Sequence, residues 1–152
     1  MITDVEKDNI RIVKDVFAAI NRRDILSVTN LLDEKVDWQS PATRTLVKEI
    51  PWSKPRHGRS EVSAFFREIL DMLKIDELSY STIVADGDTV HVEGTTRGSA
   101  VPTGCFYGSD WMMSFTLRNG KIIRLRHYFD SANIAAAFHS KGEECRAVPK
   151  AA

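Results

Sequence analysis

Hydrophobic residues in the first part of the chain recur every three or four positions, which is the period of an amphipathic helix. This pattern predicts a first helix over residues 5–22. Asp24 is a suitable N-cap for a second helix that runs to Leu32, and Ser60 for a third. The apolar positions of the first and third helices are Ile10, Val13, Phe17 and Ile20, and Val62, Phe65, Phe66, Ile69 and Leu73.

In other parts of the chain, apolar and polar residues alternate, which is the pattern of a strand. A short strand is predicted over residues 36–40. The following residues, 41–59, contain three prolines and a tryptophan, Trp52, that we expect to be exposed. A long irregular segment in a compact domain is often a lid or a binding loop. Four more strands and a terminal helix follow, over residues 77–85, 89–98, 105–117 and 121–130, and 132–138.

Helices followed by a meander of strands indicate an α+β fold, in which helices pack on one face of a curved antiparallel sheet. Side chains alternate between the faces of a strand, so parity assigns the inner face. That face is apolar, with a few polar residues embedded in it: Thr96, Tyr107, Ser109 and His127. An apolar wall with a few placed polar groups is typical of a small-molecule site. The outer face carries charges of both signs, including Glu93, Arg97, Asp110, Arg124 and Arg126.

His127 is the principal candidate for chemistry, because an imidazole in an apolar row is costly to bury and useful near neutral pH. The alternative is a neutral core histidine that bonds a hydroxyl or a carbonyl group. Ser40 would orient water or bond His127 across the pocket, and Tyr107 would donate to a developing oxyanion or point to solvent. Trp52 would act as a lid over a flat ligand. The remaining predicted ligand contacts are Trp38, Thr96, Ser109, Trp111, Met113, Leu125 and Phe129.

Length and composition limit the number of domains and the classes of protein that fit the sequence. With 152 residues, the chain fits one domain, predicted over residues 1–140 with a polar tail over 141–152. Equal numbers of acidic and basic residues give no net charge, which argues against a nucleic-acid binder. No apolar run reaches the length of a membrane span, and the polar N-terminus is unlike a signal peptide, so we expect a cytoplasmic protein. Cys105 and Cys145 are interpreted as two unrelated thiols, and no metal-ligand spacing or cofactor motif is present.

Several strings occur in an order that resembles the nuclear transport factor 2-like superfamily, which includes ketosteroid isomerase, limonene epoxide hydrolase and the SnoaL-like polyketide cyclases. These strings are Ala18-Ala19-Ile20-Asn21 with Asp24, Trp38-Gln39-Ser40-Pro41, His57-Gly58-Arg59, and Gly120-Lys121-Ile122 through Tyr128-Phe129-Asp130. The resemblance covers residues 8–138. It implies a cone-shaped fold with three N-terminal helices, a deep internal pocket, and dimerisation through the outer face of the sheet.

The catalytic groups of those relatives are largely absent here. In the resemblance to limonene epoxide hydrolase, its arginine and first aspartate match Gly94 and Thr96, and its second aspartate matches His127. Its water-holding pair matches Trp38 and Ser40. The ketosteroid isomerase groups match Ser40, Val16 and Trp111. A titratable group therefore survives at the position of His127.

The sequence thus favours a SnoaL-like enzyme without a cofactor or metal, acting by proton transfer on an apolar, cyclic metabolite. Isomerisation, cyclisation, dehydration and hydrolysis all fit. The alternative is a ligand-binding or dimeric interaction domain of the same fold that has no catalytic activity.

Overall fold

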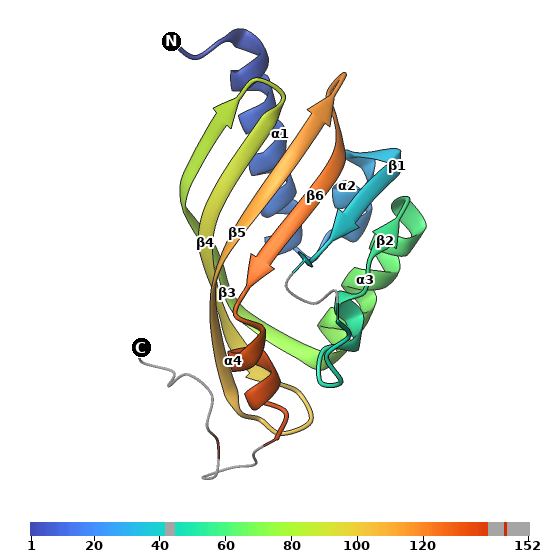
Figure 1. Ribbon diagram of the computed structural model, residues 1–152, viewed down its shortest axis with the longest axis vertical. Coiled ribbons are helices and arrows are strands. Elements are labelled where there is room, and N and C mark those ends of the chain that lie inside the picture. The colour runs from blue at the N-terminus through green and yellow to red at the C-terminus, as the bar shows by residue number, and fades with distance from the viewer. Residues whose placement is uncertain (42–44, 140–144, 146–152) are drawn as a thin grey trace.

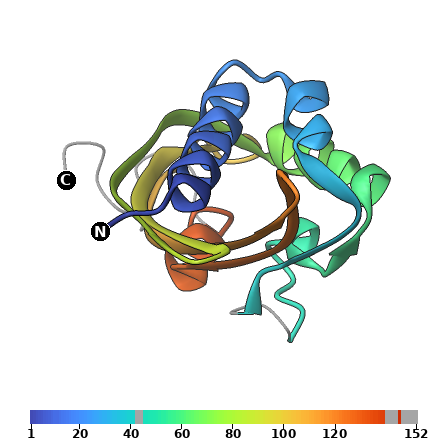
Figure 2. The ribbon, with the colours of Figure 1, turned by 90° about the horizontal axis from the view of Figure 1, so that it is seen from above.

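The computed structural model describes residues 1–41, 45–139 and 145. Three helices, α1 (Asp4–Asn21), α2 (Ile25–Asn30) and α3 (Arg59–Met72), pack beside a strongly curved sheet (Figure 1). Figure 2 shows α1 and α3 on the concave side of that sheet. A fourth helix, α4 (Ser131–Ala136), follows the last strand. The predicted α+β architecture is confirmed.

The sheet has six strands in the order β2-β1-β6-β5-β4-β3. It is mixed, since β1 runs parallel to β6 while all the other pairs are antiparallel. The prediction of an antiparallel sheet was therefore wrong for one pair, because alternation within a strand does not report the direction of its neighbour. The strand bounds are β1 Leu32–Gln39, β2 Arg56–His57, β3 Leu73–Asp86, β4 Thr89–Ala100, β5 Phe106–Arg118 and β6 Lys121–Phe129.

Two glycines of β4 accompany the sharp curvature of the sheet. A Cβ atom at Gly98 would collide with the carbonyl oxygen of Lys74, and one at Gly94 would collide with the Ser79 carbonyl and the Trp111 ring. The register of β3 against β4 shifts near both places. Irregular pairing opposite glycine lets one backbone approach another closely and bends the strand. The bend forms the hollow that the helices cover.

The helices differ from the prediction at their ends. Helix α1 begins at Asp4, where Thr3 and Glu6 form a capping box. Helix α2 has only six residues, because β1 already begins at Leu32, so only α1 and α3 are long. The third helix is capped by Gly58, which has φ +83°, and not by Ser60. It passes directly into β3 at Leu73, four residues before the predicted strand start.

The segment predicted as irregular, 41–59, contains the short strand β2 and a 3-10 helix, Pro51–Ser53. Trp52 is buried, with 3% of its surface exposed, so the expectation of an exposed tryptophan was wrong. The buried Arg56 explains this, because its guanidinium donates to the Trp52 carbonyl at 2.8 Å and to Glu68 of α3 at 2.6 Å. These bonds hold the segment against α3.

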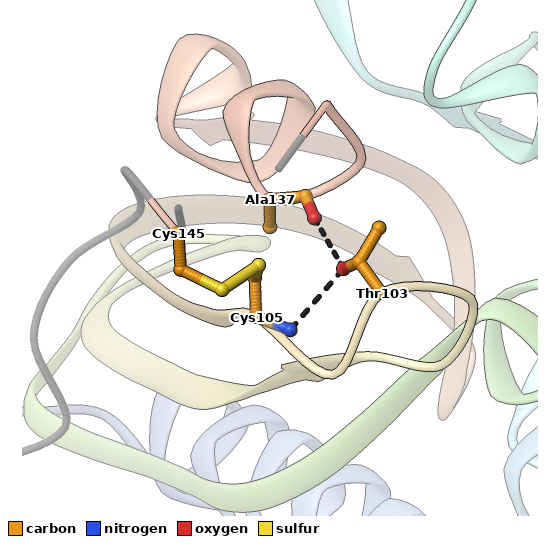
Figure 3. The surroundings of a disulfide bond; sticks show 4 residues. All are labelled: Thr103, Cys105, Ala137 and Cys145. Atoms are coloured by element: carbon orange, nitrogen blue, oxygen red, sulfur yellow. Dashed lines mark hydrogen bonds between the residues drawn. A yellow bond between two sulfur atoms is a disulfide. The ribbon is translucent and has the colours of Figure 1, made fainter. Parts of the chain in front are cut away.

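Cys105 and Cys145 form a disulfide (Figure 3), so the interpretation of two unrelated thiols was wrong. Their Cα atoms are 5.4 Å apart, within the usual range for a disulfide. The Thr103 hydroxyl bridges the Cys105 amide and the Ala137 carbonyl beside the disulfide. Spacing alone did not reveal the pairing, because the two residues are 40 positions apart. Cys145 lies in the predicted tail, and the rest of residues 141–152 is outside the described part of the chain.

None of the helices that the described residues form is long and apolar enough to cross a membrane. Disulfides are typical of oxidising compartments and uncommon in the cytoplasm. The cytoplasmic location therefore stays a prediction from the sequence.

Candidate functional site

A cavity of about 100 Å³ lies between the concave face of the sheet and the helices. Its walls are almost entirely apolar, with aromatic residues from α3, β1 and β5. Ten of the predicted site residues line it: Trp38, Ser40, Trp52, Thr96, Tyr107, Ser109, Trp111, Met113, His127 and Phe129. Leu125, the eleventh, does not line the cavity, because it is wholly buried in the core.

His127 belongs to β6 and pairs with Met113 of β5. Its ring lies 6.2 Å from the Trp111 ring and 4.9 Å from the Phe129 ring, measured between centroids. Part of its side chain stays accessible, and that part faces the cavity that His127 lines. Its Nε2 atom is buried and has no hydrogen-bond partner among the described residues. The alternative of a core histidine satisfied by a hydroxyl or carbonyl therefore does not describe this nitrogen.

Desolvation by the surrounding protein lowers the pKa of His127 to about 4. A charged imidazolium would have to give up hydration without gaining a partner. The ring is therefore neutral at physiological pH. A neutral imidazole has one nitrogen that accepts a proton and one that donates.

Ser40 lies beside His127. In the parallel pairing of β1 with β6, Trp38 is opposite Leu125 and Gln39 is opposite Arg126. The next residue along each chain brings Ser40 next to His127, one strand apart. Ser40 is buried and lines the same cavity. The structure thus brings these two predicted residues together.

Two small hydroxyls of the cavity wall, Thr96 and Ser109, have structural partners. Thr96 accepts a hydrogen bond from the Trp111 indole nitrogen at 2.9 Å. Ser109 donates to the Asp110 carbonyl and accepts from the Asp130 amide at 2.9 Å. The Thr96 bond fixes Trp111, whose ring also stacks on Phe17 of α1, and the Ser109 bonds fix the backbone at Asp130. The wall is held rigidly by these contacts, and neither hydroxyl is spare for chemistry.

Tyr107 is not brought close to His127. On β5, Tyr107 lies six positions before Met113, the partner of His127, which is about 20 Å of strand. The Tyr107 hydroxyl lies beside Gly98 of β4, where an added Cβ atom would be 3.0 Å away. This hydroxyl is buried and has no hydrogen-bond partner among the described residues. Tyr107 and His127 therefore occupy different parts of the cavity.

Sequence reasoning missed Arg23, which also lines the cavity. Within the described part of the chain, it is the one exposed residue among those that line the cavity, so it marks the opening. Its backbone has φ +60°, just after α1 ends. The Asn21-Arg22-Arg23-Asp24 helix break was a visible signal. The sequence alone did not show which of the two arginines turns toward the cavity.

Within residues 1–41 and 45–139 and at Cys145, no three metal-binding side chains lie close enough together to hold an ion. Arg56 and Arg126 are the buried cations of the described residues, and each is paired with a carboxylate away from the cavity wall. Among the described residues, two titratable side chains of the sheet line the cavity, Tyr107 on β5 and His127 on β6.

Helices over a curved sheet that encloses an apolar cavity define a nuclear transport factor 2-like fold. A solved nuclear transport factor 2-like protein from Burkholderia xenovorans LB400 is 27% identical to this chain, with a TM-score of 0.75 over 87% of this chain and 96% of the other. Another from Burkholderia pseudomallei K96243 is 23% identical, with a TM-score of 0.76 over 88% and 98%. A structure of TerC co-crystallised with polyporic acid is 22% identical, with a TM-score of 0.76 over 88% and 99%.

Residues 13–125 match the SnoaL-like domain family. The match spans most of the chain, which therefore belongs to this family, as the sequence resemblance predicted. No curated protein has a sequence that matches this chain significantly.

Proposed function

We propose that this chain is a cofactor-independent enzyme in which His127 transfers a proton on a small, apolar, cyclic ligand. The observation that carries this proposal is the buried, unpartnered imidazole nitrogen in a cavity with apolar walls. Leaving a buried polar group without a partner costs stability. A ligand atom that bonds this nitrogen would recover that cost.

The reaction that fits best is removal of a proton from carbon next to a carbonyl group. The neutral imidazole accepts the proton through its unprotonated nitrogen, and the electron pair of the C–H bond moves into the enolate. Where the ligand has a double bond conjugated with the enolate, return of the proton to the far carbon of the resulting dienolate gives an isomer. Loss of a leaving group from the enolate, or attack by it within the ligand, gives dehydration or cyclisation. Ser40, beside His127, would hold the developing charge or a water molecule.

The cavity volume limits the ligand. An engineered cavity of about 150 Å³ in another protein holds benzene. At about 100 Å³, this cavity accepts one small ring unless side chains move. The co-crystallisation of TerC with polyporic acid supports a small organic ligand in a protein of this fold.

Deuterium exchange tests the proposal. Cyclopentanone, cyclohexanone and 2-cyclohexenone would be incubated with the protein in D2O, and NMR would follow loss of the hydrogens next to the carbonyl. The wild-type protein should accelerate exchange for at least one ketone, and His127→Gln should reduce this at least about 100-fold. His91→Gln is the matched control, since His91 lies on β4 and does not line the cavity. Equal rates for wild type and His127→Gln would refute the mechanism.

The second candidate is a ligand-binding domain without catalysis. The absence of the relatives' catalytic sets from the sequence favours it. Binding of these ketones without exchange by the wild-type protein would support this candidate over an enzyme.

We also propose a homodimer through the outer face of the sheet. Met112 and Tyr128 form a cross-strand pair there, and about half of each side chain is exposed. Glu93, opposite Met112 on β4, would offer a charged contact at the edge of such an interface. Sedimentation of Met112→Lys, compared with the wild-type protein, tests this. A wild-type monomer would contradict the proposal.

A further inference from the structure

We propose that Arg23 and Tyr107 form a second polar subsite, at the mouth of the cavity, that binds an anionic oxygen group of the ligand. The inference rests on the proposed function, because it adds a recognition group to the same cavity. It predicts the ligand class: a molecule with an apolar ring and a carboxylate or similar acidic group. The two residues come from distant parts of the chain, the end of α1 and the start of β5.

Tyr107 supplies a buried donor. Only 2% of its surface is exposed, it lines the cavity, and its hydroxyl has no partner in the described part of the chain. A buried tyrosine hydroxyl usually finds a hydrogen-bond partner in the folded protein. The hydroxyl therefore has an unused bond, which a ligand oxygen at this part of the wall would take once the side chains around the hydroxyl shift to admit it.

Arg23 supplies the positive charge. Its guanidinium donates to the carbonyl oxygens of Ile75 at 2.8 Å and Ile20 at 3.1 Å. These bonds fix the side chain between α1 and β3. No carboxylate of the described residues lies within ion-pair distance of it, whereas the adjacent Arg22 pairs with Asp24. A guanidinium has five N–H donors, so several stay available for a carboxylate.

The electrostatic surroundings link the two residues. Burial raises the pKa of Tyr107 most, the charge of Asp76 raises it further, and the charge of Arg23 lowers it. The net pKa lies above the ordinary value, so the phenol keeps its proton and acts as a donor. The backbone places the two side chains in one region, because Arg23 bonds the carbonyl of Ile75, Ile75 pairs with Gly98, and the Tyr107 hydroxyl lies beside Gly98. An anionic oxygen between them would meet a neutral donor and a cation.

The location of the subsite also determines how the ligand is oriented in the cavity. A carboxylate in the apolar interior near Trp111 and Phe129 would lose its hydration without compensation. At the mouth, Arg23 is exposed and keeps water nearby. The acidic group therefore stays at the mouth, and the apolar ring points inward toward His127.

A pair of matched probes tests the subsite. 4-Phenylbutyrate and its uncharged amide, 4-phenylbutanamide, share the ring and the chain length. Tryptophan fluorescence would report binding, since Trp38, Trp52 and Trp111 line the cavity. The wild-type protein should bind the acid about tenfold more tightly than the amide, an effect typical of a charge-assisted hydrogen bond.

Variants then measure the contributions of Arg23 and Tyr107 to binding separately. Arg23→Gln should remove the difference between acid and amide and leave amide binding unchanged. Tyr107→Phe should weaken both probes several-fold, since it removes a neutral donor. Arg22→Gln is the matched control, because it removes an adjacent positive charge that does not line the cavity, and it should change neither affinity. Circular dichroism would verify that each variant folds.

Three results would overturn the subsite: equal wild-type affinity for the two probes, equal effects of Arg23→Gln and Arg22→Gln, or no binding of either probe at millimolar concentration. His127→Gln distinguishes this inference from the proposed function. If the subsite is present, that variant keeps its preference for the acid even if deuterium exchange shows no role for His127.

Discussion

Adjacent residues of β6, Arg126 and His127, are polar side chains on opposite faces of the sheet, and their environments differ. On the outer face, the Arg126 guanidinium donates to the Asp37 carboxylate at 2.6 Å and to the Leu125 carbonyl at 2.8 Å. Partial burial raises the pKa of Asp37, but hydrogen bonds from Arg126 and Gln39 outweigh it and the net pKa is lowered. On the inner face, His127 Nε2 has no protein partner among the described residues.

This difference distinguishes a residue with a structural role, Arg126, from a candidate for a functional role, His127. Arg126 leaves only its Nε atom unpartnered, while its charge is compensated within the protein. The Nε2 atom of His127 on β6 and the hydroxyl of Tyr107 on β5 have no partner among the described residues, and both residues line the cavity. Native proteins satisfy nearly all buried polar groups, so two exceptions lining one cavity indicate where a ligand contributes the missing bonds.

The largest effect is expected for Gly98→Ala on the inner face. The new methyl group would collide with the Lys74 carbonyl and contact the Tyr107 hydroxyl, so β3 and β4 would have to separate. We expect a loss of more than about 3 kcal/mol in the free energy of unfolding, measured with urea. Ser99→Ala, at the next position of β4, is the control and should change it by less than about 0.5 kcal/mol. Equal effects would mean that the inner face has room at this bend.

On the outer face, Asp37→Asn should cost about 2 to 3 kcal/mol. Arg126 is only 9% exposed, and without Asp37 its charge would be buried and unpaired. The value is below that for a fully buried pair because about a third of the Asp37 side chain is exposed. The double variant Asp37→Asn with Arg126→Met should recover part of the loss in urea unfolding. Additive losses in the double variant would show that the two residues are not coupled.

The sequence predicted much of this architecture because the relevant signals are local. Strand parity correctly assigned Trp111, Met113 and His127 to the cavity wall, and the helical period located α1 and α3. The parallel pairing of β1 with β6 was missed because it depends on residues some 90 positions apart. The same is true of the buried ion pair between Asp37 and Arg126. Parity correctly placed Arg126 on the outer face, but it did not show that the side chain is buried there against Asp37 of β1.

The sequence predicted which residues line the site, but not how they are placed relative to one another. Parity places Tyr107 and His127 on one face, yet it does not give their separation along β5. It also does not show that Thr96 and Ser109 are used to hold Trp111 and Asp130. Arg23 was missed because it follows a helix end, where no periodic pattern indicates the direction of a side chain.

The pH dependence of the free energy of unfolding tests whether His127 is shielded from water and unpaired in the folded protein. The pKa of His127 is about 4 in the folded protein, compared with about 6.5 in the unfolded chain. Between these values only the unfolded chain binds the proton, so stability is complete above about pH 6.5 and falls as the pH drops toward 4. From pH 7 to pH 5 this residue should account for a loss of about 2 kcal/mol. Urea unfolding of wild type and His127→Gln at both pH values measures it as the difference between their losses.

An equal loss in the two proteins would mean that the imidazole is hydrated or paired in the folded state. The same lowered pKa applies to catalysis. If His127 is the base, kcat/KM of the free enzyme should stay level from neutrality down to about pH 5 and decline as the pH falls through about 4. A decline centred near 6.5 would instead indicate a solvent-exposed histidine.

The smallest effect, and the one with an unusual sign, is expected for Tyr107→Phe. Removing a buried hydroxyl that has no partner should stabilise the protein by about 1 kcal/mol, because the variant no longer leaves a polar group unsatisfied. Tyr128→Phe is the matched control on the outer face, where the side chain is half exposed, and it should leave stability unchanged. Thermal and urea unfolding measure both variants. A destabilised Tyr107→Phe protein would show that the hydroxyl is already bonded in the folded state, and the proposed subsite would then lack a donor for the ligand. If Tyr107→Phe is more stable than the wild-type protein but binds the probes more weakly, the hydroxyl contributes to ligand binding and lowers the stability of the protein without ligand.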